Sequence, residues 1–227
     1  MKDQLKTSRL YAYPEHSLAY PYLARLNYPW EILSMLSEMI GALGAGLPEE
    51  EYDRVGEDIW ISKSAKIAAT ASINGPCIIG HEAEVRHCAF LRGAALIGDG
   101  AVVGNSTELK NCILFDGVQV PHYNYVGDSV LGYKSHLGAG AITSNVKSDK
   151  SGVVVRIGEE RVETGRRKFG AILGDFVEVG CGSVLNPGTV IGSHTNIYPL
   201  SSVRGCVPEN SIFKAPDRIV KKRKSDD

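Results

Sequence analysis

An apolar residue returns every six positions along most of this chain, and that period restricts the fold more than any other feature. From Ile61 the spacing runs to Thr143, shortened by one residue at two places, and a last block extends from Leu173 to Val203. Ile, Leu or Val leads 20 of these 21 hexads. A period of six matches neither the 3.6 residues of a helical turn nor the alternation of a long strand. It predicts short strands separated by turns.

Two other hexad positions follow rules. The second position is Gly in nine hexads and the fifth is small or β-branched in 19. Glycine eases the backbone at a turn, so each hexad reads as one strand and one corner. Three strands make a triangular coil of 18 residues, and 21 hexads make seven coils, stacked about 4.8 Å apart by strand pairing. We therefore predict an all-β protein, a parallel β-helix with the leading aliphatics inside.

Composition excludes several classes of protein. The 227 residues are 43% apolar with a formal net charge of −1, which argues against disorder and gives no reason to expect a nucleic-acid partner. No apolar run reaches 18 residues and the N-terminus lacks a signal-peptide core, so we expect no membrane association. Five cysteines without a CxxC pair indicate reduced, buried thiols and a cytoplasmic location.

Two segments interrupt the period and divide the chain. Residues 1–58 contain no hexad, and Pro29 opens an amphipathic helix that we expect to act as a cap over the first coil. The β-helix is predicted over 59–210, with an insertion at 146–170 that reads as an extruded β-hairpin carrying seven basic residues. Residues 211–227 form a C-terminal tail.

His122 stands out among the histidines. Leading residues point inward, so His122, third in its hexad, is expected to face outward. A neutral imidazole can accept a proton from an amine or hydroxyl nucleophile. Glu108, beside the first shortened hexad, could orient it, and the basic insertion suits a phosphorylated acceptor.

From about residue 92 to residue 207 the chain resembles a known family. The matching stretches are GNSTELKNCIL, VPHYNYVGDSVLG, LGAGAITSN, KFGAILGDFVEVG and CVPEN. They are similar to the C-terminal acetyltransferase domain of the bifunctional N-acetylglucosamine-1-phosphate uridyltransferase/glucosamine-1-phosphate acetyltransferase, a hexapeptide-repeat acyltransferase. The resemblance implies a left-handed winding and direct transfer from acetyl-CoA to the amino group of a glucosamine-1-phosphate-like or nucleotide-linked sugar. It also implies a homotrimer, and no metal for acetyl transfer.

The resemblance assigns roles to individual residues. His122 would be the general base, supported by Glu108, with Asn145 helping to hold base and substrate. The sugar-phosphate side would be formed by Arg92, Lys110, Tyr125, His136 and Lys168. On the coenzyme side, Ala139 would present a backbone group to the thioester carbonyl. Cys181 and Pro199 would line the pantetheine channel. The family's basic contact to coenzyme A near the C-terminus has no matching residue here, and Lys214 or Arg218 could take its place.

The chain also departs from the family. His136 stands where the family usually has Asn, and the segment between Asn145 and Lys168 is much longer than usual. The uridyltransferase half has no counterpart, so we expect no nucleotidyltransferase activity from these residues. Two alternatives stay open: a non-catalytic scaffold that binds a sugar or acyl-CoA, and a zinc-dependent hydrase of the same fold that would use His81, His87 and His122 across a subunit contact.

Overall fold

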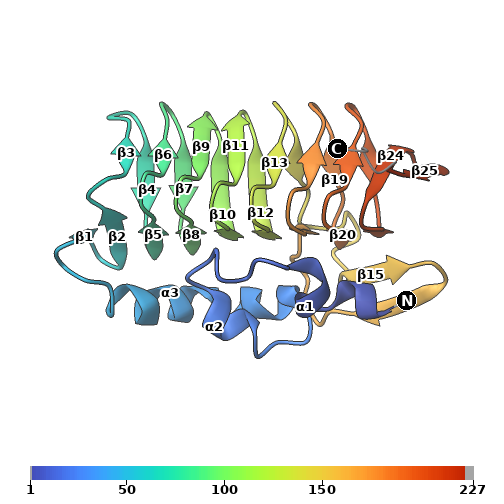
Figure 1. Ribbon diagram of the computed structural model, residues 1–227, viewed down its shortest axis with the longest axis horizontal. Helices are drawn as coiled ribbons and strands as arrows, with labels where there is room; N and C mark the ends of the chain where they lie inside the picture. The colour runs from blue at the N-terminus through green and yellow to red at the C-terminus, as the bar shows by residue number, and fades with distance from the viewer. Residues whose placement is uncertain (1, 223–227) are drawn as a thin grey trace, which may run out of the picture.

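The computed structural model describes residues 2–222 and stacks short parallel strands into a prism with three faces (Figure 1). Face one contains β2 (Ile59–Ser62), β5 (Cys77–Ile79), β8 (Ala95–Ile97), the second halves of β10 (Glu108–Leu114) and β12 (Tyr125–Leu131), β17 (Ala171–Leu173), β20 (Thr189–Ile191) and β23 (Cys206–Val207). Face two contains β3 (Lys66–Ile67), β6 (Glu84–Val85), β9 (Val102–Asn105), β11 (Gln119–His122), β13 (His136–Leu137), β18 (Glu178–Val179), β21 (Asn196–Ile197) and β24 (Ser211–Ala215). Face three contains β4 (Ser72–Asn74), β7 (Phe90–Arg92), the first halves of β10 and β12, β14 (Ile142–Thr143), β19 (Val184–Leu185) and β22 (Ser202–Val203).

The leading aliphatics of the hexads stack directly on one another inside the prism. On face one, Ile61 pairs with Ile79 and Ile79 with Ile97, and the same register continues to the last coils. Most of these side chains are completely buried, so the inward row forms a dry core. The predicted parallel β-helix is confirmed.

The prism is longer than the predicted seven coils. β23 and β24 continue the stack beyond Val203, with Val207 and Phe213 buried in the inward row. The sequence count stopped early because the step from Val203 to Val207 is four residues instead of six. β24 therefore belongs to the prism and not to a tail, and β25 (Arg218–Lys221) folds back on it as an antiparallel strand.

The two shortened hexads mark two tight corners between face three and face one. Asn111 and Asp128 turn these corners alone, with φ values of 49° and 48°. Asn and Asp tolerate this left-handed conformation better than other non-glycine residues. Because each corner is one residue shorter, β10 and β12 run continuously across two faces, and both corner side chains turn toward the same surface.

The outer surface of face one is apolar, which determines where the N-terminal segment packs. Its outward side chains are buried and stand in register from coil to coil: Ile78, Leu96, Ile113, Val130, Ile172 and Val190. α3 (Leu36–Gly44) lies against β5, β8 and β10 along this face, and the 3-10 helix Pro29–Ser34 lies against β12 (Figure 1). The expected position over the first coil is therefore wrong, and Ile67 at that end remains 36% exposed.

The rest of the segment before the prism is irregular. It contains the 3-10 helix Lys2–Leu5, α1 (Thr7–Leu10) and α2 (Tyr20–Leu23), followed after α3 by β1 (Tyr52–Gly56). β1 pairs antiparallel with β2 and so covers the first strand edge of face one. Within residues 2–222 no helix is long and apolar enough to cross a membrane.

The predicted hairpin is present, but it packs against the prism instead of extending away from it. β15 (Val154–Ile157) and β16 (Glu160–Glu163) pair antiparallel. Val153 and Val155 are buried, because β15 lies against β23 near the end of face one (Figure 1). The insertion therefore covers the late part of the apolar face that α3 leaves open.

Candidate functional site

His122 lies at the end of β11, where the chain turns from face two to face three. Backbone hydrogen bonds join this corner to the next coils: Gly140 N donates to His122 O at 3.0 Å, and Gly182 N donates to Ala139 O at 2.8 Å. One coil further on, Leu200 N donates to Cys181 O at 2.9 Å. The corner thus aligns four exposed residues, which we call the corner ridge: His122, Ala139, Cys181 and Pro199.

The imidazole of His122 is exposed and has no side-chain hydrogen bond to any residue in 2–222. Its main chain is held firmly by Asn124, a buried amide with 3% exposure. Asn124 Oδ1 accepts from His122 N at 3.1 Å, while Nδ2 donates to Gly138 O and Ala141 O, each at 2.9 Å. One side chain therefore ties the His122 strand end to the turn that carries Ala139.

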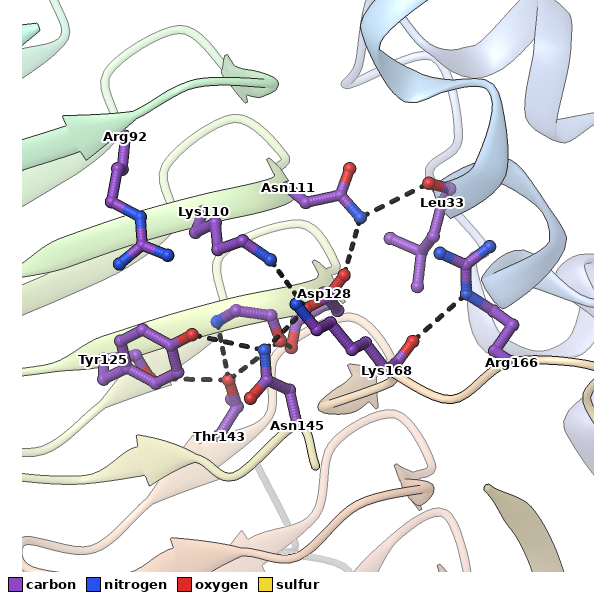
Figure 2. Close-up of polar contacts among 12 residues, drawn as sticks. Leu33, Arg92, Lys110, Asn111, Tyr125, Asp128, Thr143, Asn145, Arg166 and Lys168 are labelled. Carbon is purple, nitrogen blue, oxygen red and sulfur yellow. Dashed lines mark hydrogen bonds and ion pairs between the residues drawn. The ribbon is translucent and has the colours of Figure 1, made fainter. Parts of the chain in front are cut away.

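The Asp128 carboxylate gathers polar side chains at the next corner, between face three and face one (Figure 2). It is 3% exposed and accepts from Asn111 Nδ2 at 2.8 Å and Asn145 Nδ2 at 2.6 Å. Lys110 Nζ lies 3.4 Å away, and Asn145 also donates to the Tyr125 hydroxyl at 3.2 Å. We call this group, together with Arg92, Arg166 and Lys168, the Asp128 cluster.

Lys168 reaches this cluster because the insertion closes on itself. Val146 and Lys168 form an antiparallel bridge, and Phe169 N donates to Asn145 O at 2.9 Å. Figure 2 shows the Lys168 side chain pointing toward Asp128 from the side of the insertion. The segment of residues 146–168 therefore leaves the prism and returns beside Asn145, as the family resemblance requires for Lys168.

Glu108 does not meet His122 within this chain. It lies on β10, in register with Tyr125 on β12, and its carboxylate accepts from Arg92 at 2.9 Å. The expected contact between Glu108 and the imidazole is absent among residues 2–222. Arg92 and Glu108 instead form an ion pair at the outer edge of the Asp128 cluster.

The remaining predicted residues lie further from His122. His136 is on β13 in face two, with its ring bonded to Glu178 at 2.9 Å. Lys214 is on β24, its ammonium 5.4 Å from the ring centre of Tyr198, which precedes the last ridge residue. Arg218 lies on the exposed strand β25.

Burial alters two ionisable groups of the cluster. It raises the pKa of the Tyr125 phenol, and the nearby carboxylates of Asp128 and Glu108 raise it further, so Tyr125 stays protonated and can donate a hydrogen bond. Burial also lowers the pKa of the Arg166 guanidinium, an effect that the Asp128 charge opposes. Arg166 still carries its charge at neutral pH, but it carries it partly out of water.

Residues 73–212 match the family model described as the GMPPB C-terminal domain. The chain belongs to this family. The matched range includes the whole corner ridge and the whole Asp128 cluster, whereas Lys214, Arg218 and the N-terminal segment lie outside it.

Two curated relatives are named as bifunctional proteins. The chain is 31% identical over 197 residues to the bifunctional sugar-1-phosphate nucleotidylyltransferase/acetyltransferase of Sulfurisphaera tokodaii, covering 85% of this chain and 49% of that protein. It is 30% identical over 224 residues to the bifunctional protein GlmU of Methanococcus maripaludis, covering 90% and 50%. The chain thus spans about half the length of these relatives. Among solved structures, a hexapeptide transferase family protein from Anaplasma phagocytophilum aligns at 17% identity and a TM-score of 0.48, over 73% of this chain and 79% of that one.

Sequence reasoning missed several members of the site. Asp128, Asn111 and Asn124 were not singled out, although the first two mark the shortened hexads. Arg166 was counted only as one of seven basic residues in the insertion. The shortened hexads were the available signal, since a corner turned by one residue places its side chain outside the regular pattern.

The three histidines considered for zinc are dispersed. His81 lies at another corner, where it contacts Ser62 at 2.8 Å and Glu51 at 3.2 Å, while His87 bonds to Thr70 at 2.9 Å two coils before His122. Across residues 2–222, no group of three His, Cys, Asp or Glu side chains has the spacing of a metal site.

Proposed function

We propose that this protein transfers the acetyl group of acetyl-CoA to the amino group of a phosphorylated or nucleotide-linked amino sugar. The observation that carries the proposal is the exposed, unbonded imidazole of His122, aligned with Ala139 on the corner ridge and separated from a cationic cluster by only the width of face three. The name of the Sulfurisphaera tokodaii relative, which combines nucleotidylyltransferase with acetyltransferase, supports the same chemistry.

The corner ridge suits the coenzyme side of the reaction. Ala139 is exposed, and its backbone N–H has no acceptor among residues 2–222, so it can donate to the thioester oxygen. Cys181 and Pro199 extend the ridge by two coils, about 10 Å at the strand spacing, and would line the pantetheine arm. Cys181 itself needs no covalent role, because direct transfer uses no enzyme nucleophile.

Transfer would proceed in one balanced sequence. The amine nitrogen of the sugar attacks the thioester carbonyl, and neutral His122 accepts the proton that the nitrogen loses. The C–S bond then breaks while the new C–N bond stays, and the protonated His122 gives its proton to the leaving thiolate, so that coenzyme A departs as its thiol and the imidazole is neutral again. A positioned base contributes about 10²–10⁴ in rate, and the rest comes from holding both substrates.

The Asp128 cluster suits the acceptor side. Lys110 and Lys168 present ammonium groups, and Tyr125 presents a protonated hydroxyl, at one end of face three. Asn145 lies between them, bonded to Tyr125 and Asp128. These donors match the oxygen atoms of a phosphate group, while the sugar ring would extend across face three toward His122.

We also infer that the protein assembles as a homotrimer in which Tyr123 and Leu200 pack against a neighbouring subunit, while the corner ridge stays open along the subunit boundary. Tyr123 and Leu200 flank the ridge with 65% and 84% exposure, although both are large apolar side chains. Burying them against another subunit would remove apolar surface from water. Light scattering that gives the mass of a single chain would refute this inference.

The proposed reaction is tested by thiol release from acetyl-CoA in the presence of glucosamine 1-phosphate. His122→Ala should lower kcat by at least about a hundredfold. His87→Ala is the matched control, since His87 is exposed at the same kind of corner two coils earlier, and it should retain full activity. Unchanged turnover in His122→Ala refutes the assignment, and binding of acetyl-CoA without any turnover by the wild type supports a non-catalytic scaffold instead.

A further inference from the structure

The Asp128 cluster carries more positive than negative charge. Its cations are Arg92, Lys110, Arg166 and Lys168, and two carboxylates lie among them. Glu108 pairs with Arg92 at 2.9 Å and Asp128 lies 3.4 Å from Lys110. Lys168 and Arg166 have no carboxylate within ion-pair distance among residues 2–222. Two positive charges are therefore left without a partner beside a surface suited to an anion.

Of these two cations, Arg166 gives the stronger indication of a bound anion. It is partly buried, and its Nε donates to the Lys168 carbonyl at 3.2 Å. That is the only hydrogen bond that the guanidinium makes to residues 2–222, so its two terminal nitrogens remain available as donors. Removing a guanidinium partly from water while its donors are unused costs free energy, unless an anionic ligand accepts hydrogen bonds from it.

The position of Arg166 depends on the insertion. Its carbonyl accepts from Val153 N at 2.7 Å, which fixes the returning strand just before Lys168 enters the cluster. Figure 2 shows Arg166 next to Lys168, on the side of the cluster that faces the N-terminal segment. Asp128 lies near enough for its charge to act on the guanidinium.

We propose that Arg166 is a specificity-determining residue that binds the phosphate oxygens of the acceptor, together with Lys168. The proposal rests on the proposed function for its substrate. A phosphate monoester carries about −1.5 to −2 charges at neutral pH, which matches the two unpaired cations. The planar guanidinium adds two parallel N–H donors, which an ammonium group does not offer.

A nucleotide-linked amino sugar offers the same chemistry, since its diphosphate also carries two negative charges. Either source would make Arg166 select phosphorylated over unphosphorylated acceptors. The insertion would then tune acceptor choice, whereas the corner ridge serves the acetyl donor.

The test compares Arg166→Met, Arg166→Lys and Arg167→Ala as full chains. Arg167 is exposed and one residue away, so its removal changes the net charge without removing the partly buried guanidinium of Arg166. Calorimetry measures binding of glucosamine 1-phosphate, UDP-glucosamine and glucosamine, and thiol release gives KM for each acceptor and for acetyl-CoA. Thermal melting verifies that each variant is folded.

Arg166→Met should weaken binding of a phosphorylated acceptor by about 10- to 100-fold, the range of a charge-assisted hydrogen bond. Its affinity for glucosamine and its KM for acetyl-CoA should not change, Arg166→Lys should recover part of the loss, and Arg167→Ala should behave as wild type. If only one of the two phosphorylated probes loses affinity in Arg166→Met, that probe shows whether the acceptor is a sugar phosphate or a nucleotide-linked sugar. Equal loss with glucosamine, no loss with Arg166→Met, or no binding of either phosphorylated probe to the wild type overturns the proposal. Binding that depends on Arg166 without thiol release would refute the acetyl transfer alone.

Discussion

Asn124 offers the sharpest test of how the corner ridge is held. Replacing it with Ala removes two hydrogen bonds from Nδ2 to Gly138 O and Ala141 O and one from His122 N to Oδ1. Each such bond contributes about 1 kcal/mol net, and Ala141 O would cost more because it loses its donor, whereas Gly138 O keeps a hydrogen bond from Ala141 N at 3.0 Å. Because Asn124 is 3% exposed, water cannot easily replace the amide. We expect a loss of about 2–5 kcal/mol in the free energy of unfolding.

Asn105→Ala is the matched control. Asn105 lies in register with His122 one coil earlier, but its Nδ2 makes a single bond, to His87 O at 3.0 Å, near solvent. Its removal should cost less than about 1 kcal/mol. Urea titration measures both variants, and hydrogen exchange at the His122 and Gly140 amides reports the local effect if the coils do not unfold together. Equal destabilisation in the two variants, or unchanged exchange at His122, would refute the reasoning.

Three further predictions concern other parts of the molecule. Gly41→Ala in α3 should stabilise the protein by about 0.5–1 kcal/mol, because a Cβ at this position meets nothing within 4 Å. Gly44→Ala should destabilise the protein, because its Cβ would overlap the Trp60 ring. Thermal melts measure the change in Tm of both variants, and equal shifts would contradict the prediction. Iodoacetamide should modify the exposed thiols Cys88 and Cys181 but not Cys112, because burial raises the pKa of Cys112 to about 12. Acetyl-CoA should protect Cys181 alone from this modification, and peptide mass spectrometry measures the modification of each thiol. Burial raises the pKa of Asp116, so the folded wild type holds this proton more tightly than the unfolded chain and loses stability as the pH rises through the folded-state pKa. Asp116→Asn cannot ionise, so it should gain stability relative to wild type as the pH rises through that pKa, and a difference in Tm that stays constant with pH would contradict this.

The thiols show where sequence reasoning was too coarse. Burial was expected for every cysteine and is confirmed for Cys77 and Cys112, but Cys88 and Cys181 are exposed. In the hexad frame Cys88 and Cys181 occupy corner positions, whereas Cys77 and Cys112 lie on strands of face one. Hexad position, and not residue type, therefore decides the exposure of each thiol.

The candidate site was predictable in part. His122 was expected to face outward and is exposed, because the inward register leaves it no other direction. Sequence spacing could not show whether Glu108 contacts His122, because an arginine on the neighbouring coil can pair with the same carboxylate. Arg92 lies on that coil and takes the Glu108 carboxylate.

By itself the sequence determined the prism, its inward core and the location of the insertion. These follow from a local rule repeated every six residues, so no distant contact was needed to deduce them. Only the tertiary structure decided that α3 and the hairpin cover face one, because that choice depends on the outward residues of strands 17 to 42 positions apart meeting in one apolar surface. The same holds for the Asp128 cluster. Lys168 lies beside Asn145 only because residues 146–168 leave the prism, pack against it and return to it. Contacts between segments distant in sequence therefore hold the cluster together.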